Sequence, residues 1–190
     1  MTSKLKTDVL ETVSGSGTIA LTNQLSGMTS ASVPSGSVIQ VVSVTKTDTF
    51  STTSGSYVDL TGLSVSITPS STSSKILITG SVCWGTSDVV PYQMFFKLVR
   101  DSTSIGIADA DGNRSRCTFG AQGIYQTDSV HYAPINFLDT PSTISATVYK
   151  IQCYAEGGRT LWINRGAESD GNNSVTARFT SSITVQEIKG

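Results

Sequence analysis

The only histidine of the chain, His131, is the first residue to examine for acid–base or nucleophilic chemistry. A Ser-His-Asp hydrolase needs a serine fixed beside the histidine, and no GxSxG segment supplies one here. Serine is so frequent in the sequence that its presence alone says nothing about a nucleophile. We therefore interpret His131 as an ordinary surface residue and predict no catalytic residue.

Carboxylates are the next candidates, because glycoside cleavage uses two carboxyl groups that flank the scissile bond. No spacing in the sequence pairs any two of them, and acidic residues in turns mainly serve turn formation. A carbohydrate-binding or carbohydrate-active domain therefore stays an alternative without assigned catalytic residues. The acidic side chains open to such a role are Asp109, Asp111, Asp139, Glu156, Glu168 and Asp170.

Metal and cofactor motifs are weak. The run Asp109-Ala-Asp111-Gly112-Asn113 resembles part of a calcium loop, but its glycine comes two places early and no acidic residue closes it. The three cysteines, Cys83, Cys117 and Cys153, are widely spaced and form no CxxC, which argues against zinc. We expect reduced thiols, no metal and no cofactor.

The composition describes a folded chain with little charge. Of its 190 residues, 14% are charged and 37% are hydrophobic, and the net charge is −1. Disorder combines low hydrophobicity with high charge, and general nucleic-acid binders carry basic patches. We expect one sizeable domain without a nucleic-acid partner. Because no apolar run approaches the roughly 20 residues of a membrane span, and the N-terminus lacks the apolar run of a signal peptide, we expect no membrane insertion.

The segment Val175 to Ile188 has the clearest periodicity. Up to Gln186 its odd positions are apolar or small, as at Phe179 and Ile183, and its even positions are polar. Successive strand side chains point to opposite faces, so the alternation predicts an antiparallel strand with one buried face. Such a strand would be roughly 45 Å long at about 3.3 Å per residue. We therefore expect a bulge or bend at Ser181-Ser182.

Further strands are predicted along the chain from alternating or nearly continuous apolar segments. Asp101-Ser102 predicts a tight turn that returns through Ile105 and Ile107, and Glu156-Gly157-Gly158 predicts a hairpin between the strands on either side of it. The predicted strands are Val38–Val44, Tyr57–Leu60, Leu63–Thr68, Lys75–Trp84, Tyr92–Arg100, Cys117–Gln126, Pro134–Leu138, Ser145–Tyr154 and Thr160–Asn164.

No helical period occurs, so we predict an all-β fold in which two antiparallel sheets pack face to face. Eight to ten strands, a long final strand and several long connections favour a jelly-roll-like β-sandwich over an immunoglobulin-type one. We assign this sandwich to residues 38–190.

Residues 1–37 contain too few apolar side chains to form a core of their own. They are either a flexible arm, which is common at termini, or an extended segment that orders only by association with copies of itself or a host structure. We favour an anchoring and trimerisation segment. Three copies could bury five apolar side chains about a common axis: Leu5, Val9, Val13, Ile19 and Leu21.

Short stretches along nearly the whole chain carry a family resemblance. They are Gly17-Thr-Ile-Ala-Leu21, Val33-Pro-Ser-Gly-Ser-Val-Ile-Gln-Val-Val42, Tyr57-Val-Asp-Leu-Thr-Gly-Leu63, Ser73-Ser-Lys-Ile-Leu77, Leu98-Val-Arg-Asp101, Phe137-Leu-Asp-Thr-Pro141 and Ser182-Ile-Thr-Val-Gln-Glu-Ile188. In their order the chain resembles tail-fibre-like and capsid-fibre virion proteins of tailed bacteriophages, especially phages of marine bacteria. The resemblance implies a non-enzymatic virion protein made in the host bacterial cytoplasm. It also implies a homotrimer whose N-terminal segment binds other virion proteins while the sandwich points outward.

Within that resemblance, a tail fibre or fibre tip is the first hypothesis, and a capsid decoration or head-fibre protein is the alternative. Receptor-binding residues would come from loops at one end of the sandwich, because loops on rigid scaffolds carry function. Their side chains suit stacking and hydrogen bonding to a host-surface glycan or protein, although the loops can equally be plain solvated connections. The candidates are Trp84, Tyr92, Asp109, Asp111, Arg114, Tyr132, Arg165, Asp170 and Asn172.

Overall fold

The computed structural model describes residues 33–86, 92–124, 129–167 and 176–190. Residues 34–190 form one compact unit. Within the described residues its secondary structure consists of eleven strands and one short 3₁₀ turn, Glu156–Gly158, which confirms the predicted all-β fold. The strands are β1 Val38–Lys46, β2 Phe50–Thr52, β3 Val58–Ile67, β4 Lys75–Thr86, β5 Tyr92–Arg100, β6 Thr103–Ile105, β7 Phe119–Ile124, β8 Val130–Asp139, β9 Thr147–Ala155, β10 Leu161–Ile163 and β11 Ser181–Ile188.

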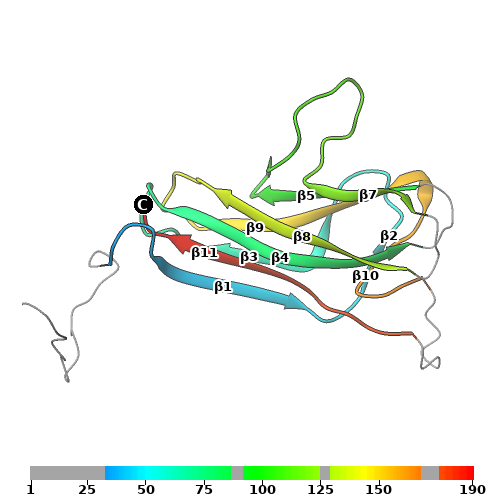
Figure 1. Ribbon diagram of the computed structural model, residues 1–190, viewed down its shortest axis with the longest axis horizontal. Coiled ribbons are helices and arrows are strands. Elements are labelled where there is room, and N and C mark those ends of the chain that lie inside the picture. The colour runs from blue at the N-terminus through cyan, green and yellow to red at the C-terminus, as the bar shows by residue number, and fades with distance from the viewer. Residues whose placement is uncertain (1–32, 87–91, 125–128, 168–175) are drawn as a thin grey trace, which may run out of the picture. The chain divides into compact units, whose positions relative to one another are not determined.

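The strands form two antiparallel sheets, which can be followed in Figure 1. In the first sheet β1 pairs with β11, β11 with β4 and β4 with β8, and the short β10 and β2 continue from β4. In the second sheet β3 pairs with β9 and β9 with β5, while β5 also pairs with β6 and β7. The main strands thus run β1-β11-β4-β8 and β3-β9-β5-β7. This is the strand order of a jelly roll, so the predicted fold class is confirmed.

The core lies between the sheets and follows the predicted alternation. In β4 the side chains of Ile76, Ile78 and Trp84 face inward, and in β11 Ile183 and Val185 do the same. In β11 and in the first half of β4 the intervening residues are less buried and point to the outer face of the first sheet, whereas the last five residues of β4 are all buried. Burial on one face only explains why period-two alternation was readable in these segments.

The last strand is shorter than its pattern predicted, because β11 begins at Ser181 and residues 176–180 are not strand. The edge of β4 gives the physical reason. Residues Lys75–Ser81 of that edge pair with β11, but Trp84–Thr86 pair with β10, so β11 has no free partner backbone beyond Ser181. The chain therefore leaves the sheet where a bend was expected.

The predicted hairpin around Gly157 and Gly158 is wrong. Strand β9 pairs with β3 and β5 in the second sheet, whereas β10 pairs with β4 and β2 in the first. The two glycines have φ of 65° and 71°, a left-handed conformation that non-glycine residues rarely adopt. They carry the chain from one sheet to the other instead of folding it back on itself.

Two smaller differences concern β2 and β3. The predicted strands Tyr57–Leu60 and Leu63–Thr68 are one strand, β3, interrupted by a register shift between Asp59 and Ser64. Strand β2 had no predicted counterpart; it is three residues long.

Asn164 joins three strands where β10 ends. Its side-chain Nδ2 donates to the carbonyl oxygens of Lys46 at 2.9 Å and Asp48 at 2.8 Å. Its Oδ1 accepts a hydrogen bond of 2.6 Å from Ser181 Oγ, and its backbone N donates to Cys83 O at 2.9 Å. These bonds satisfy the backbone at the place where β10 replaces β11 along β4.

Candidate binding site

A long loop, residues 106–118, connects β6 to β7 (Figure 1). Ala108 N donates to Cys117 O at 3.3 Å, and Arg116 Nε donates to Ala108 O at 2.6 Å, so the two arms of the loop are tied together. At its base Thr118 Oγ1 donates to Ile105 O and accepts from Leu98 N. The loop is thereby fixed to β5 and β6.

The tip of this loop is a turn that carries an exposed ion pair. Arg114 N donates to Asp111 O at 3.1 Å, and Gly112 between them has a φ of 53°. The Asp111 and Arg114 side chains meet at 3.3 Å and are 72% and 84% exposed. An ion pair this exposed contributes only about 0–1 kcal/mol to stability. Both side chains are therefore available to a ligand at little cost to the fold.

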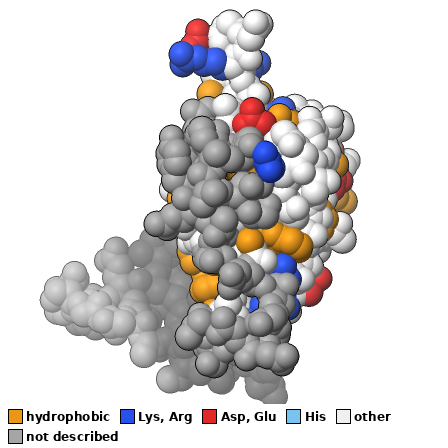
Figure 2. All heavy atoms as spheres, turned by 90° about the vertical axis from the view of Figure 1, so that its right-hand side faces the viewer, with side chains coloured by type: hydrophobic (Ala, Val, Ile, Leu, Met, Phe, Trp, Pro, Cys, Tyr) orange, Lys and Arg blue, Asp and Glu red, His pale blue; other side chains and the backbone are white. Residues whose placement is uncertain are grey.

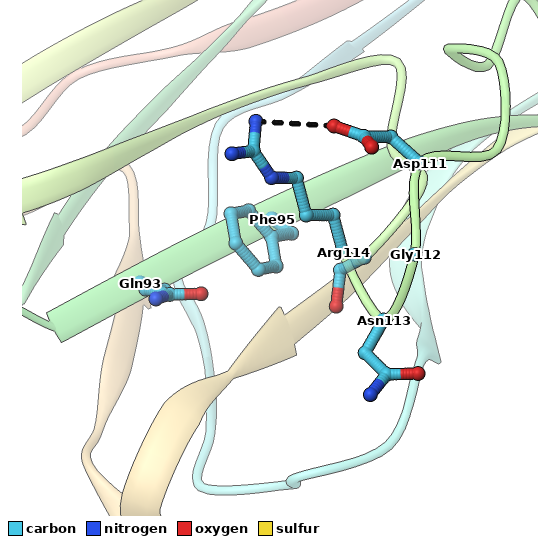
Figure 3. A pocket seen from close by; sticks show the side chains of 7 residues that line it. Gln93, Phe95, Asp111, Gly112, Asn113 and Arg114 are labelled. Atoms are coloured by element: carbon cyan, nitrogen blue, oxygen red, sulfur yellow. Dashed lines mark ion pairs between the residues drawn. The ribbon is translucent and has the colours of Figure 1, made fainter.

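Between the loop and β5 lies a space of about 760 Å³, which we call the loop hollow. Figure 3 shows Gln93 and Phe95 reaching it from β5, while Asp111, Gly112, Asn113 and Arg114 belong to the loop. Ser115 also lines it. A ring and several hydrogen-bonding side chains thus converge on one space.

The floor of the loop hollow continues into a row of aromatic rings on the outer face of the second sheet. The rings of Phe95 and Tyr154 lie 5.8 Å apart, and those of Tyr154 and Tyr57 lie 5.7 Å apart. The Lys97 ammonium lies 3.9 Å from the Tyr57 ring centroid. Burial raises the pKa of Tyr57 to about 12, so its hydroxyl is neutral at pH 7 and the Lys97 ammonium is the charge at this end of the row.

Trp84 cannot serve in a binding surface, which corrects the sequence-based expectation. It is only 2% exposed, because it lies on the inner face of β4. There its ring stacks on His131 at 4.9 Å and contacts Phe96 at 5.9 Å. Trp84 is a core residue.

Tyr132 and Arg165 both belong to the end of the sandwich where β4 finishes and β8 begins: Tyr132 pairs with Cys83, and the Arg165 carbonyl lies beside Gly85. This end faces the viewer in Figure 2. Tyr132 is 56% exposed on the outer face of the first sheet and meets the Phe179 ring edge-on at 6.2 Å. Arg165 lies over the Trp162 ring at 3.8 Å and donates to the Gly166 and Ala167 carbonyls. Burial, and then the charge of Arg178, lower the pKa of Arg165. Its donors are thus used inside the protein.

The described parts of the candidate loops contact different strands. Near Gly85, the backbone of Arg165 and Ser129 does come together, on the first sheet. Asp111 and Arg114 instead face β5 on the outer side of the second sheet. Asp109 is exposed in the same loop but does not line the hollow.

Some predicted residues lie outside the part that the structure describes. Tyr92 is the first residue of β5, and its side chain is not among those described. Asp170 and Asn172, and the five apolar residues assigned to trimerisation, also fall outside the described residues.

The described residues offer little for catalysis. His131 Nε2 is buried without a hydrogen-bond partner, and no hydrogen bond between described residues joins its ring to a serine or a carboxylate. Asp139 is held by Arg100, and Glu156 Oε2 accepts from Gln93 N at 3.0 Å. Among the described ranges, no group of three or more His, Cys, Asp or Glu side chains could hold a metal ion. No helix within them is long and apolar enough to span a membrane. The arrangement is suited to binding.

Sequence reasoning missed Gln93, Phe95 and Tyr154. The signal was present, because Phe95 alternates with the core residues Met94 and Phe96, and Tyr154 alternates with Cys153. Aromatic residues at outward positions of neighbouring strands indicate a row of rings on the outer face of the sheet. That the two rings adjoin could not be seen, because it depends on β5 pairing with β9.

Comparison with solved structures finds viral particles. The chain is similar to infectious bursal disease virus Gx strain, with a TM-score of 0.46 and 17% identity over 80% of this chain and 32% of that chain. Infectious bursal virus derived T=1 particles match with a TM-score of 0.38 and 17% identity over 79% of this chain and 36% of that chain. The infectious bursal disease virus VP2 subviral particle matches with a TM-score of 0.36 and 16% identity over 78% of this chain and 37% of that chain.

The chain spans about a third of the length of each of these proteins. No protein-family model matches it, and no curated protein matches its sequence. These likenesses are too weak to assign a function, and the jelly-roll fold rests on the strand order of the two sheets.

Proposed function

We propose that this protein is a structural virion protein of a tailed bacteriophage, a tail fibre or fibre tip that contributes to host attachment and has no enzymatic activity. The observation that carries the proposal is the ordered resemblance of seven short stretches to phage fibre proteins along nearly the whole chain. The fold agrees with it, since jelly rolls are common in viral and carbohydrate-binding domains.

The geometry of the sandwich supports attachment. A loop tied at its base and across its arms presents Asp111, Asn113 and Arg114 above β5. Binding residues on a fixed loop of a rigid scaffold lose little conformational entropy when a ligand binds. In the proposed particle the sandwich points outward to the host surface, where it meets a glycan or a protein.

The proposal includes assembly. The protein is a homotrimer, made in the host cytoplasm, whose residues 1–37 bind other virion proteins. Leu5, Val9, Val13, Ile19 and Leu21 of three chains bury one another about the threefold axis. Assembly supplies the apolar burial that this segment lacks within one chain.

The alternative is a capsid decoration or head-fibre protein. It draws on the same resemblance, which includes capsid-fibre proteins, and on the same fold, because jelly rolls also build capsids. The position of the protein on the particle separates the two roles.

Purified phage particles can be labelled with gold-conjugated antibodies against the sandwich and imaged, with mass spectrometry to verify the protein in the same preparation. We expect the label on the tail fibres, and purified protein in excess should slow adsorption of the phage to host cells. Label on the head would establish the alternative. Absence of the protein from particles would overturn both virion roles.

A further inference from the structure

We propose that the loop hollow binds a neutral saccharide, with Asp111, Asn113 and Arg114 holding its hydroxyl groups. The inference rests on the proposed attachment role and names the chemical class of its ligand. It is drawn from the hydrogen-bonding groups, the charge balance and the rings of the hollow.

The polar lining matches a polyhydroxylated ligand. Asp111 only accepts hydrogen bonds and Arg114 only donates them, whereas the amides of Gln93 and Asn113 and the Ser115 hydroxyl do both. Sugar hydroxyls also donate and accept, and neighbouring hydroxyls fit side by side onto planar carboxylate, amide and guanidinium groups. Few other neutral ligand classes would satisfy so many groups within one small space.

The charge balance favours a neutral ligand over an acidic one. The Asp111 carboxylate and the Arg114 guanidinium compensate each other at 3.3 Å. Behind the hollow, the Glu156 carboxylate accepts a hydrogen bond from Gln93 N at 3.0 Å and adds negative charge. A carboxylate or phosphate bound in the hollow would therefore meet a cation, Arg114, that is already paired, while the Lys97 ammonium lies at the far end of the aromatic row.

The aromatic row supplies apolar contact for the C–H faces of sugar rings. Phe95 is 5% exposed and contributes a small contact at the floor. Tyr154 beside it is half-buried, and the row ends where Lys97 covers Tyr57. A chain of two or three sugar units running from the hollow over Tyr154 gains contact with each unit. Longer oligomers should therefore bind more tightly than single sugars.

The test uses the full-length protein and a defined panel of probes. These are D-glucose, D-galactose and D-mannose, their linear oligomers of two to six units, and D-glucuronic and D-galacturonic acid. Saturation-transfer NMR detects binding of each sugar, and calorimetry gives its Kd. We expect at least one neutral hexose to bind, its oligomers to bind more tightly up to three units, and its uronic acid to bind at least about tenfold more weakly.

Three variants locate the site. Asp111→Ala/Arg114→Ala should weaken binding at least about tenfold, because it removes charged hydrogen-bonding groups. The matched control is Asp59→Ala/Lys150→Ala, which removes an ion pair of 2.7 Å on the outer face of the same sheet but away from the hollow. It should bind like the parent. Tyr154→Leu should bind the single sugar as the parent does, but its affinity should no longer rise with the number of sugar units. Asn113→Ala provides a milder second test within the loop.

Three outcomes overturn the proposal: no binding by any neutral sugar of the panel, tighter binding of the uronic acids, or binding that survives Asp111→Ala/Arg114→Ala. The result is separable from that of the virion role. If the protein binds sugar but is absent from particles, the saccharide site is supported and the fibre role is refuted. If the protein is found on the fibres but binds no sugar, the fibre role is supported and the saccharide site is refuted.

Discussion

The carboxylate of Asp139 lies inside the sandwich and ties the two sheets together. It extends from β8 and meets Arg100 Nη1 of β5 at 3.0 and 2.9 Å. Tyr149 of β9 donates its hydroxyl to the same carboxylate at 2.7 Å. The side chains of Asp139 and Arg100 are 8% and 26% exposed. Burial, followed by the hydrogen bond to Asp139, raises the pKa of Tyr149, so the tyrosine stays a donor.

Replacing Asp139 by Asn should lower the free energy of unfolding by about 3 kcal/mol, because it leaves the Arg100 charge without its partner in a largely buried place. Asp59→Asn breaks the pair with Lys150, in which the carboxylate is 53% exposed, and should cost no more than about 1 kcal/mol. Urea denaturation of both variants measures the difference. Equal losses in the two variants would show that the inter-sheet pair has no special weight.

Stability should decline in alkaline solution because of a buried thiol. Burial, with a smaller contribution from Asp59, raises the pKa of Cys153 from 9.0 to about 12. The unfolded thiol therefore loses its proton above about pH 9 while the folded thiol keeps it. Stability from this group is complete below pH 9 and falls between pH 9 and 12, by at most about 1.4 kcal/mol per pH unit.

Denaturation of the parent and of Cys153→Ala at several pH values checks this prediction. The variant is less stable at neutral pH because it leaves a cavity, but its decline between pH 9 and 11 should be shallower. Tyr57→Phe serves as a comparison, since the pKa of Tyr57 is also raised to about 12 and its effect starts only near pH 10. Parallel curves for parent and Cys153→Ala would contradict the assignment.

At the scale of single elements, strands and turns that depend on neighbouring residues could be predicted from the sequence. The points where two strands compete for one edge of a third strand could not. The turn at Asp101-Ser102 and strand β5 agree with the prediction because each is specified by neighbouring residues. The start of β11 was misplaced because β10 occupies the edge of β4 that a longer β11 needs. The hairpin failed for the same kind of reason. Pairing partners far apart in sequence decide where a strand ends, and one sequence segment does not contain that information.

The candidate site follows the same division. Loop residues Asp111 and Arg114 were identified from their types alone, and the structure places both in the loop hollow. Trp84 was misassigned, although its own strand pattern already put it on the buried face. Phe95 and Tyr154 adjoin only through the pairing of β5 with β9, which no local signal predicts.

Strand β4 should tolerate no side chain at Gly80. A Cβ there would lie 2.1 Å from the Ser182 carbonyl oxygen of the neighbouring strand, and backbone atoms of a sheet cannot move aside cheaply. Gly80→Ala should therefore destabilise the protein by more than about 3 kcal/mol or prevent folding. Gly55→Ala is the matched control, because nothing lies within 4 Å of its Cβ position. Thermal melts that show similar losses in both variants would contradict this account.

At the scale of the whole molecule, the compact unit contains a complete core between two sheets. Its N-terminal end is tied to its C-terminal end: Gly36 N donates to Lys189 O at 2.8 Å, and Lys189 N donates to Ser37 O at 2.9 Å. Ser35 Oγ also donates to Gly190 O. A truncation that is meant to test assembly should therefore begin at Pro34 and keep these bonds.

The full-length protein should be a homotrimer, and the protein beginning at Pro34 should not. The reason is that residues 1–33 carry the apolar side chains proposed to meet about the threefold axis, whereas the truncated protein keeps its own core. Light scattering should give full-length protein a mass three times that of the 20.0 kDa chain. The truncated protein should show a lower association state with an unchanged β-type circular dichroism spectrum.

Leu5→Ser/Val9→Ser/Val13→Ser should shift the full-length protein in the same direction. A monomer mass for the full-length protein at micromolar concentration would contradict the predicted trimer. A trimer that survives the truncation would move the contact surface from the N-terminal segment to the sandwich.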